Sequence, residues 1–296
     1  MKEKMKKNRQ DPKITKELKN KTILITGGAG SIGSLLTKKI LQYPVHSVRV
    51  LDINEHALFL LKREISDKRL RLLLGDIQDS ERVEIAGNGT DIIFHAAAIK
   101  NIEISEFNPI ETINTNVNGT TNLIKMAIKN QPSKFVNIST DKAVEPTTLY
   151  GTTKQLSEKL TTWAGSISQN TKFGTIRFAN VFESHGNVFE IWNEESNQNL
   201  PLSITHRLMK RYFFHADDAV NFILKCLPMI NKGKIFVPKM KSYNIINLAS
   251  KISKKQKIIG LRKGEKLEEI LLSKDEQKRS KNLKDMWIIN PFSNKV

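Results

Sequence analysis

The sequence predicts an α/β fold, in which a doubly wound parallel sheet is followed by a smaller mixed α/β lobe. Up to residue 180, short apolar runs rich in β-forming residues alternate with segments of helical character, and a glycine-rich turn joins the first run to the first helix. Strands that alternate with helices favour a parallel sheet with helices on its faces. After Asn180 this regularity fades, which predicts the separate lobe.

The elements follow from these patterns in chain order. We expect strands at 22–26, 47–52, 69–75, 91–97, 134–140 and 174–180. The clearest helices are expected at 32–41, 57–65, 109–129 and 150–162. Residues 1–20 are rich in lysine and almost without apolar periodicity, which predicts a disordered basic arm. A first domain then spans 21–180. A lobe over 181–296 is expected to cover the carboxyl ends of the strands, where ligands of such sheets bind.

The net charge of +18 is concentrated at the two ends of the chain. Residues 1–21 carry nine Lys and Arg against three acids, and residues 251–296 carry thirteen against six. Such a charge raises the hypothesis of a nucleic-acid partner. The basic runs lack interleaved aromatic residues, however, and match no nucleic-acid module. We favour a solvated arm and a surface suited to anionic substrates or acidic lipids, and keep nucleic acid as the lesser alternative.

Several classes of site are disfavoured by composition. The sequence contains one cysteine, Cys226, so an internal disulfide is excluded, and its apolar, helically spaced surroundings predict a buried thiol. The six histidines are scattered, which predicts no metal site. No stretch reaches the roughly 18 apolar residues that a membrane span needs, and the N-terminus lacks the apolar segment of a signal peptide. We expect a cytoplasmic protein.

A glycine motif predicts the cofactor. Residues 26–33, Thr-Gly-Gly-Ala-Gly-Ser-Ile-Gly, follow the first strand directly and open the first helix. Gly27, Gly30 and Gly33 allow a tight turn, a close approach of the backbone to a pyrophosphate, and close packing of helix on strand, while the helix N-terminus faces the anion. The motif predicts a Rossmann-type NAD(P)-binding domain over 21–180, with Ser31 and Ile32 at the cofactor.

Two carboxylates follow the next strands. Asp52 ends the second strand, where it can accept hydrogen bonds from the adenosine ribose and would repel a 2′-phosphate, so NAD is favoured over NADP. The alternative for Asp52 is a helix N-cap. Asp76, beside Ile77 after the third strand, is expected either to bind the adenine amino group or to cap the next helix.

Tyr150 and Lys154 predict redox chemistry. They are four residues apart on one expected helix and share a face. A lysine ammonium beside a phenol favours the phenolate and lowers its pKa toward working pH. That phenolate can take a hydroxyl proton while hydride leaves the same carbon for nicotinamide, with Thr140, at the end of the fifth strand, orienting the oxygen.

Several motifs together resemble a known family. The glycine turn, His95-Ala96-Ala97-Ala98, Asn116-Val117-Asn118-Gly119 and Tyr150-x-x-x-Lys154 are similar to those of an extended short-chain dehydrogenase/reductase. The resemblance implies cofactor contacts from the following residues: Ala96, Ala97, Ala98, Asn116, Tyr150 and Lys154.

Four further segments narrow the resemblance. They are Ser-Thr-Asp-Lys-Ala at 139–143, Arg-Phe-Ala-Asn-Val at 177–181, Phe-Val-Pro-Lys at 236–239 and Gly-Leu-Arg-Lys-Gly-Glu-Lys at 260–266. Together they resemble the UDP-N-acetylglucosamine 4,6-dehydratases of the polysaccharide-biosynthesis type, including the inverting enzymes. The match runs from about Lys21 to the C-terminal end, so it covers nearly the whole chain.

Asp141 and Lys142 distinguish this family from simple epimerases. A sugar 4-epimerase of the superfamily needs only the Tyr/Lys pair and a Ser or Thr. Removal of water needs two further groups, a base for the C5 proton and an acid for the departing C6 hydroxyl. The resemblance places Asp141 and Lys142 at the strand terminus, facing the active site. It implies that Lys142 removes the C5 proton, Asp141 protonates the leaving oxygen, and hydride returns to C6.

The resemblance also implies the substrate contacts. Asn180 is expected at the sugar or diphosphate, and Lys100 over the sugar. Arg262 and Glu265 are expected at the uridine end, because a guanidinium suits diphosphate and a carboxylate suits ribose hydroxyls. Arg211 is a further expected substrate residue.

The sequence departs from the family pattern near the substrate. Where relatives commonly show Asp-x-Arg-Met-Thr-Arg, residues 206–211 read His-Arg-Leu-Met-Lys-Arg, so Arg211 remains and Arg207 is a possible replacement for the arginine lost at Leu208. His185 stands where an arginine is usual, and Lys263 where a proline is usual. These changes leave the exact sugar open and the redox core untouched.

The leading hypothesis is a sugar-nucleotide 4,6-dehydratase with UDP-N-acetylglucosamine as substrate. One alternative is a UDP-sugar 4-epimerase or a related oxidoreductase that keeps the C6 oxygen. Another, of a different class, is a non-catalytic nucleotide-binding protein whose basic ends recruit an anionic partner. Relatives assemble through helices that flank the sheet, so we also expect a homo-oligomer through 109–129 and 150–162.

Overall fold

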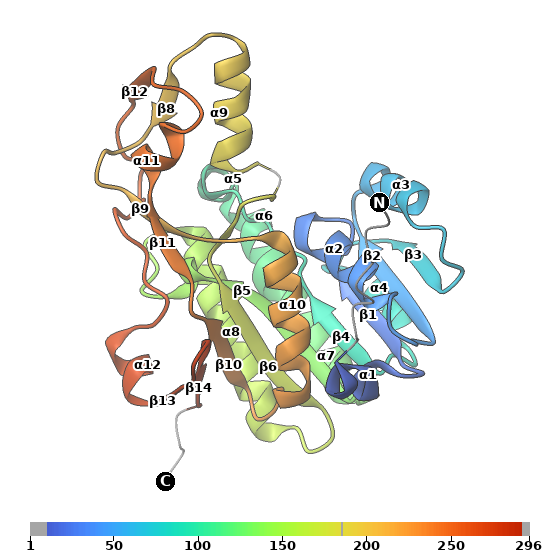
Figure 1. Ribbon diagram of the computed structural model, residues 1–296. Helices are drawn as coiled ribbons and strands as arrows, with labels where there is room; N and C mark the ends of the chain where they lie inside the picture. The colour runs from blue at the N-terminus through green and yellow to red at the C-terminus, as the bar shows by residue number, and fades with distance from the viewer. Residues whose placement is uncertain (1–10, 185, 292–296) are drawn as a thin grey trace, which may run out of the picture.

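The structure, a computed structural model, describes residues 11–184 and 186–291 (Figure 1). A large sheet forms its centre, made of β1 (Thr22–Thr26), β2 (Ser47–Asp52), β3 (Leu70–Leu74), β4 (Ile92–His95), β5 (Lys134–Thr140), β6 (Lys172–Phe178), β10 (Lys234–Pro238), β13 (Ser280–Asn282) and β14 (Met286–Ile289). Within the described residues this sheet has nine strands in the order β13-β14-β10-β6-β5-β4-β1-β2-β3. All neighbours from β3 to β10 pair in parallel, and β14 and β13 add antiparallel pairs at one edge. The predicted doubly wound parallel sheet is confirmed.

The six predicted strands all form, with small differences at their ends. The largest difference is at the sixth strand, where β6 begins two residues before the expected 174 and ends at Phe178. Asn180 starts a separate short strand, β7 (Asn180–Val181), which pairs with a strand of the lobe instead of the central sheet. The chain therefore leaves the sheet at Ala179, directly beside the cavity described below.

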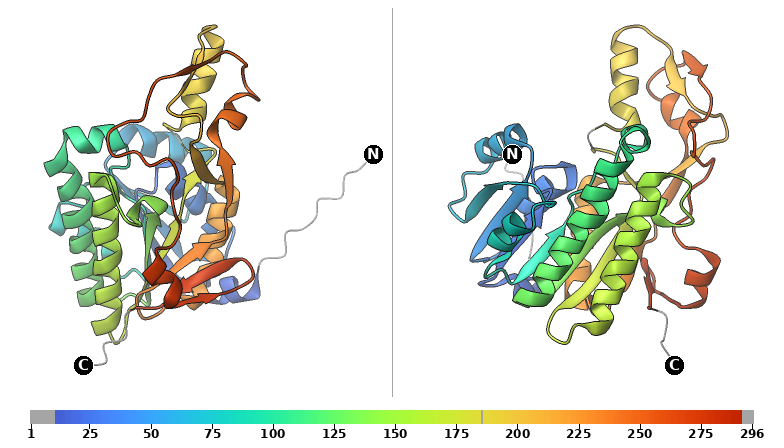
Figure 2. Two further views of the ribbon diagram at one scale, coloured as in Figure 1. Left: turned by 90° about the vertical axis from the view of Figure 1, so that its left-hand side faces the viewer. Right: turned by 180° about the vertical axis from the view of Figure 1, so that it is seen from behind.

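Helices cover both faces of the sheet, and others belong to the lobe. They are α1 (Pro12–Leu18), α2 (Ser31–Ile40), α3 (Glu55–Glu64), α4 (Ser80–Gly87), α5 (Ile102–Phe107), α6 (Pro109–Ile113), α7 (Thr120–Asn130), α8 (Leu149–Ile167), α9 (Val188–Asn197), α10 (Ala216–Cys226), α11 (Ile245–Ala249) and α12 (Lys274–Lys278). Figure 1 shows α10 in front of the sheet, and the view from behind in Figure 2 shows α7 and α8 on the opposite face.

The alternation of side chains along each strand creates two cores. In β1, Ile23 and Ile25 belong to the cluster that includes residues of α2 and α10, whereas Leu24 belongs to the cluster with α4 and α7. Successive residues of a strand point to opposite faces, so a continuous apolar run is buried on both sides, as the sequence pattern indicates. Cys226 at the end of α10 is buried, as expected.

The helix expected at 109–129 contains an irregular turn. α6 continues through a π-helical segment, Asn114–Gly119, into α7. Single π-helical turns are often found at functional sites. Here the wider turn carries Asn116, whose side chain bonds to the loop after β4.

The lobe stands over the carboxyl ends of the strands (Figure 1). It contains the three-stranded sheet of β7, β9 (Lys210–Phe214) and β11 (Lys241–Asn244), and the parallel pair of β8 (Leu202–Ile204) and β12 (Gln256–Ile258). α9 and α11 pack against these strands through a core that includes Trp192, Phe213 and Ile245.

Two predicted boundaries are wrong. The disordered arm was expected over 1–20, but residues 12–18 form α1, with Ile14 and Leu18 buried and Glu17 2.7 Å from the buried Lys134; residues 1–10 lie outside the described part. The division at 180 also fails, because β10 pairs with β6 and α10 covers the sheet. Two apolar residues among lysines gave no local signal of α1, since its stabilisation comes from contacts distant in sequence.

Candidate active site

A cavity of about 1060 Å³ lies at the carboxyl ends of the parallel strands, beneath the lobe. Its walls come from the glycine turn, the loops after β2, β3 and β4, the end of β5, the start of α8 and several segments of the lobe. Every expected site residue lines this cavity except Asn116 and Asp141. The fold therefore brings together residues that the sequence spreads over more than two hundred positions.

The glycine turn is shaped by close backbone contacts. Gly27 has φ +64°, and a Cβ there would stand 2.6 Å from the backbone of Ala97. A Cβ at Gly33 would overlap the carbonyl oxygen of Gly27. Larger residues cannot occupy these positions without moving the backbone, so the turn stays open toward the cavity at the N-terminus of α2.

Both carboxylates after the strands line the cavity. The Asp52 carboxylate accepts hydrogen bonds from the backbone N–H groups of Ala29 and Asn54, each at 3.0 Å, and so joins β2 to the glycine turn. The alternative roles as helix caps are wrong, because Asn54 caps α3 and Asp79 caps α4. Asp76 instead accepts from Gln78 N–H at 2.9 Å.

Tyr150 and Lys154 lie on the face of α8 that borders the cavity, and both are buried. Burial raises the pKa of Tyr150, the Asp141 carboxylate raises it further, and a hydrogen bond with Thr140 acts in the opposite direction. We expected Lys154 to lower the pKa of Tyr150. The surrounding side chains raise this pKa instead, so the expectation is wrong. Burial also lowers the pKa of Lys154 to about 8, with Glu158 opposing the shift.

A buried histidine lies behind this pair. His95 Nδ1 is 2.8 Å from Thr26 Oγ1, and its Nε2 is 2.8 Å from Thr120 Oγ1. Burial lowers the pKa of His95 to about 3, and the charge of Lys154 adds to the shift. His95 is therefore neutral at neutral pH, and ties β4 to β1 and α7.

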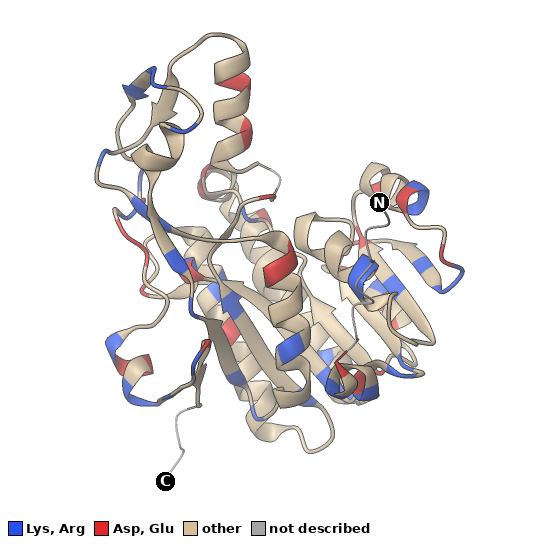
Figure 3. Cartoon of the chain, viewed as in Figure 1, with Lys and Arg blue, Asp and Glu red and all other residues tan. Residues whose placement is uncertain are grey.

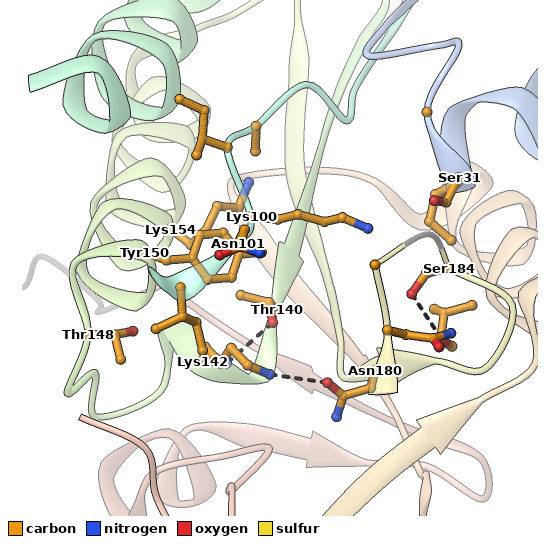
Figure 4. A pocket seen from close by; sticks show the side chains of 18 of the residues that line it. Ser31, Lys100, Asn101, Thr140, Lys142, Thr148, Tyr150, Lys154, Asn180 and Ser184 are labelled. Atoms are coloured by element: carbon orange, nitrogen blue, oxygen red, sulfur yellow. Dashed lines mark hydrogen bonds between the residues drawn. The ribbon is translucent and has the colours of Figure 1, made fainter. Parts of the chain in front are cut away.

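Lys142 is held between two oxygens at the cavity wall. Its Nζ lies 3.2 Å from Asp141 Oδ1 and 3.3 Å from Asn180 Oδ1, as Figure 4 shows for the contact with Asn180. The Nδ2 of Asn180 donates to Tyr212 O at 3.0 Å. This second bond turns the amide so that its oxygen faces Lys142. Asn180 therefore contacts Lys142, a candidate catalytic residue, and also lines the cavity.

Asp141 does not line the cavity, whereas its neighbours Thr140 and Lys142 do. Its side chain is fully buried, and its Oδ1 accepts from Thr140 Oγ1 at 2.9 Å in addition to Lys142. Its Oδ2 is buried without a hydrogen-bond partner among the described residues. The expectation that Asp141 faces the cavity is wrong for this conformation, because Thr140 and Lys142 both bind the same oxygen and hold the carboxyl inward.

Asn116 also acts from behind the wall. Its side chain accepts from Ile99 N–H at 2.8 Å and donates to Ile99 O at 2.9 Å and to Thr153 Oγ1 at 3.0 Å. All of its hydrogen-bonding groups are used within the protein. Asn116 holds the loop that carries Ala98 and Lys100 instead of lining the cavity as expected.

The expected substrate residues differ in how far their side chains are already occupied by contacts within the protein. Arg211 is buried, and its guanidinium donates to the carbonyls of Lys210, Lys266 and Leu267 and lies 3.4 Å from Glu265 Oε1. It therefore supports the loop that carries Glu265. Arg262 is more open and pairs with Glu103 of α5 at 3.1 Å. Burial lowers the pKa of Lys100, and Glu190 opposes this shift.

The structure describes Arg207 but not His185, two of the positions discussed for the departures from the family pattern. Arg207 is exposed and does not line the cavity, so it does not replace the arginine lost at Leu208. His185 lies outside the described residues. Sequence reasoning also missed Asn101 and Ser184, which line the cavity from loops. Neither has a local pattern that would have distinguished it from an ordinary polar loop residue.

Comparison with known proteins shows which family the chain belongs to. The profile of the family described as polysaccharide biosynthesis protein matches residues 23–291. The chain belongs to this family. A Methanocaldococcus jannaschii relative, named as an uncharacterized membrane protein, is 40% identical over 294 residues, which cover 94% of this chain and 88% of that one.

Two groups of named relatives differ in chemistry. The UDP-N-acetylglucosamine 4,6-dehydratase (inverting) of Campylobacter jejuni subsp. jejuni serotype O:23/36 is 36% identical over 279 residues, 92% of this chain and 83% of that one. The UDP-glucose 4-epimerase of Rickettsia canadensis is 34% identical over 282 residues, which cover 91% of this chain and 83% of that one. The solved structure of Pen from Bacillus thuringiensis has a TM-score of 0.87 and 34% identity, covering 92% of this chain and 89% of that one. The resemblance drawn from the motifs is confirmed.

No helix within the described part of the chain combines the length and the hydropathy needed to cross a membrane. Across the same residues, no three His, Cys, Asp or Glu side chains lie together in a way that would hold a metal ion.

Proposed function

We propose that this protein is an NAD(P)-dependent UDP-N-acetylglucosamine 4,6-dehydratase that also inverts C5. The observation that carries the proposal is the contact of Lys142 with Asp141, beside Thr140 and Tyr150 at the end of β5. Tyr150, Lys154 and Thr140 suffice for oxidation at C4, whereas a second acid/base pair is needed to remove water across C5–C6. The name of the Campylobacter relative supports the substrate and the inversion.

The glycine turn fits a dinucleotide. Backbone contacts exclude side chains from Gly27 and Gly33, which leaves the N-terminus of α2 open to a pyrophosphate. The cavity continues from Asp52 to Tyr150, so that one extended molecule can reach both. NAD is favoured over NADP, because the Asp52 carboxylate would repel a 2′-phosphate. When bound, the cofactor would accept hydride from C4 of the sugar and return it to C6.

Tyr150 is the proposed base for the C4 hydroxyl. Burial and Asp141 keep the phenol protonated in the chain alone, so proton removal needs positive charge nearby. Lys154, one turn further along α8, supplies that charge, since a lysine with a pKa of about 8 is mostly protonated at neutral pH. Thr140 Oγ1 orients the substrate oxygen between them.

Lys142 and Asp141 are the proposed base and acid of the elimination. Moving one proton from the Lys142 ammonium to the Asp141 carboxylate gives a neutral amine and a carboxylic acid, the two forms that the step requires. The amine removes the C5 proton, and the acid protonates the C6 oxygen as the C6–O bond breaks and water leaves. When hydride returns to C6, C5 takes up a proton, and inversion requires that this proton arrive from solvent on the face opposite to Lys142. Asp141 Oδ2 has no partner among the described residues, so the carboxyl can turn toward the cavity.

The uridine diphosphate is proposed to bind under the lobe. Arg262 would exchange Glu103 for the diphosphate, since a guanidinium binds phosphate oxygens in pairs. Glu265, placed by Arg211, would accept from the ribose hydroxyls. Lys100 and Asn180 line the same cavity at the proposed position of the sugar.

The second candidate is a UDP-sugar 4-epimerase. The complete burial of Asp141 favours it, because a carboxyl that stays behind the wall cannot reach a leaving oxygen. The Rickettsia relatives carry that name.

Incubation of the purified protein with UDP-N-acetylglucosamine and either NAD⁺ or NADP⁺, followed by mass spectrometry, separates the two. We expect loss of one water in the wild type and none in Lys142→Ala, with nuclear magnetic resonance of the product reading C5. An unchanged mass together with conversion at C4 would establish the epimerase instead.

A further inference from the structure

The end of the lobe that carries β8 and β12 is strongly basic. Residues 199–211 and 250–263 contain nine Lys and Arg and no Asp or Glu. Three of these cations pair with carboxylates elsewhere, namely Lys210, Arg211 and Arg262. The other six are exposed and form no ion pair within the described residues: Arg207, Lys251, Lys254, Lys255, Lys257 and Lys263.

Exposed aliphatic side chains lie among these cations. Leu200, Leu208, Ile258 and Leu261 are 49%, 65%, 41% and 45% exposed. β8 and β12 pair in parallel over three residues each, a length of about 10 Å, and Leu202 N–H donates to Lys255 O at 2.9 Å, so the chain at Leu200 runs beside the lysines that lead into β12. None of these four side chains, nor the six unpaired cations, lines the cavity. We call these ten residues the basic lobe surface.

The basic lobe surface lies where the molecule projects. Figure 3 shows Lys and Arg over β12 and the adjoining loops, at the end of the lobe far from the central sheet, while acidic residues of the lobe lie on α9 and on the segment that descends past β9, which contains Glu265, Glu268 and Glu269. A flat partner can therefore reach this end without contacting the sheet or its helices.

We propose that the basic lobe surface docks on an anionic membrane. Lysine and arginine are attracted to acidic headgroups, and neighbouring aliphatic side chains gain further by entering the boundary of the acyl chains. A second copy of the chain fits poorly, because a symmetric contact would bring the same six cations together. A nucleic acid fits less well, because neither segment contains a Phe, Tyr or Trp on which bases stack. Docking leaves the cavity residues unchanged and does not depend on which sugar is used.

Vesicle sedimentation with the full-length protein tests the proposal. We expect binding to vesicles of phosphatidylcholine mixed with phosphatidylglycerol, no binding to phosphatidylcholine alone, and weaker binding at high salt. The double substitution Lys254→Glu with Lys257→Glu should lower the affinity for the mixed vesicles by at least about tenfold, because each cation near such a surface contributes several-fold. Leu208→Ser with Ile258→Ser should lower it too, which separates insertion from charge alone.

A matched control makes the same change of charge elsewhere. Lys274 and Lys281 are exposed on α12 and β13, at the opposite end of the molecule, and Lys274→Glu with Lys281→Glu should leave vesicle binding almost unchanged. Equal loss in both double variants, or vesicle binding that survives the lobe substitutions, would overturn the proposal. A change of oligomeric state in the lobe variant would also overturn the proposal. So would a protein that binds DNA but no vesicles and loses this DNA binding in the lobe variant. Water loss from the sugar nucleotide is measured alongside and should persist in the lobe variants, so failure of docking is distinguishable from failure of the proposed activity.

Discussion

The ammonium nitrogen of Lys142 lies 3.3 Å from the amide oxygen of Asn180, and the amide nitrogen of Asn180 donates to Tyr212 O. The backbone of β9 therefore sets the direction in which Asn180 presents its oxygen. A base that must reach one particular hydrogen benefits from such a fixed neighbour. The lobe thus contributes to the position of a residue in the short turn that follows β5.

This relationship predicts a change in the rate of proton removal at C5. Asn180→Asp places a second carboxylate beside the Lys142 ammonium, so an additional ion pair must be broken before Lys142 can reach C5, and this step should be slower. Asn180→Ala should slow the same step by about tenfold, the size expected for one hydrogen bond to a charged group. Deuterium uptake from solvent at C5, measured against pH, reports this step alone. A profile identical to that of Ser184→Ala, a matched change at the cavity wall, would contradict the assignment.

His95 predicts a loss of stability in acid. Its pKa is about 3 in the folded protein and near 6.5 when unfolded, so the unfolded chain binds an extra proton between these values. The free energy of unfolding should therefore fall as pH drops below 6.5, by about 2 kcal/mol between neutral pH and about pH 5. Urea unfolding of the wild type and of His95→Gln measures this. The His95 interpretation fails if the variant loses as much stability as the wild type over that range.

Lys154 predicts an effect of the same sign in a higher range of pH. Its pKa is about 8 when folded against 10.5 when unfolded, so the folded state carries a cost while the side chain is charged, and that cost is relieved as pH rises through 8 toward 10.5. Lys154→Met removes the charge at similar volume. We expect it to raise the free energy of unfolding at neutral pH by up to about 3 kcal/mol, while abolishing turnover. Denaturation at several pH values should show the difference shrinking above pH 8; a constant difference would contradict this explanation.

The outer face of α8 predicts self-association. Leu156, Trp163 and Ile167 are 42%, 52% and 50% exposed and share one face of the helix. We expect a homo-oligomer in which this face is covered, and Trp163→Glu should convert it to a monomer, as light scattering after gel filtration would show. Ile85→Glu on α4, another exposed aliphatic, is the control. A wild type that is already monomeric would refute the prediction.

Much of the fold was predictable because its signals are local. Apolar runs, turn residues and helical spacing act within a few residues, so they located all six strands and the helices α2, α3, α7 and α8, whereas α4 and α5 were not placed. The glycine turn and the pair Tyr150 and Lys154 were predictable for the same reason. Their chemistry depends on a spacing of three or four residues that any helix or turn preserves.

The arrangement of the site was less predictable. Arg177 was noted as part of a motif, yet its buried guanidinium binds Glu158 and Glu276, the second 99 residues away. Arg211 was expected at the substrate and instead holds the backbone of the loop that carries Glu265. In each case the partner is distant along the chain, and residue type alone does not reveal it.

The sequence by itself determined the order of strands and helices, the class of cofactor turn and the set of reactive side chains, because those depend on neighbours along the chain. Only the tertiary structure decided that Asp141 turns behind Thr140, that Asn116 serves the loop after β4, and that α1 packs as a helix. These outcomes depend on burial and on hydrogen bonds to groups far away in sequence. Removing a carboxylate or an amide from water is favourable only where such partners meet it, and where they meet is set by the packing of the whole chain.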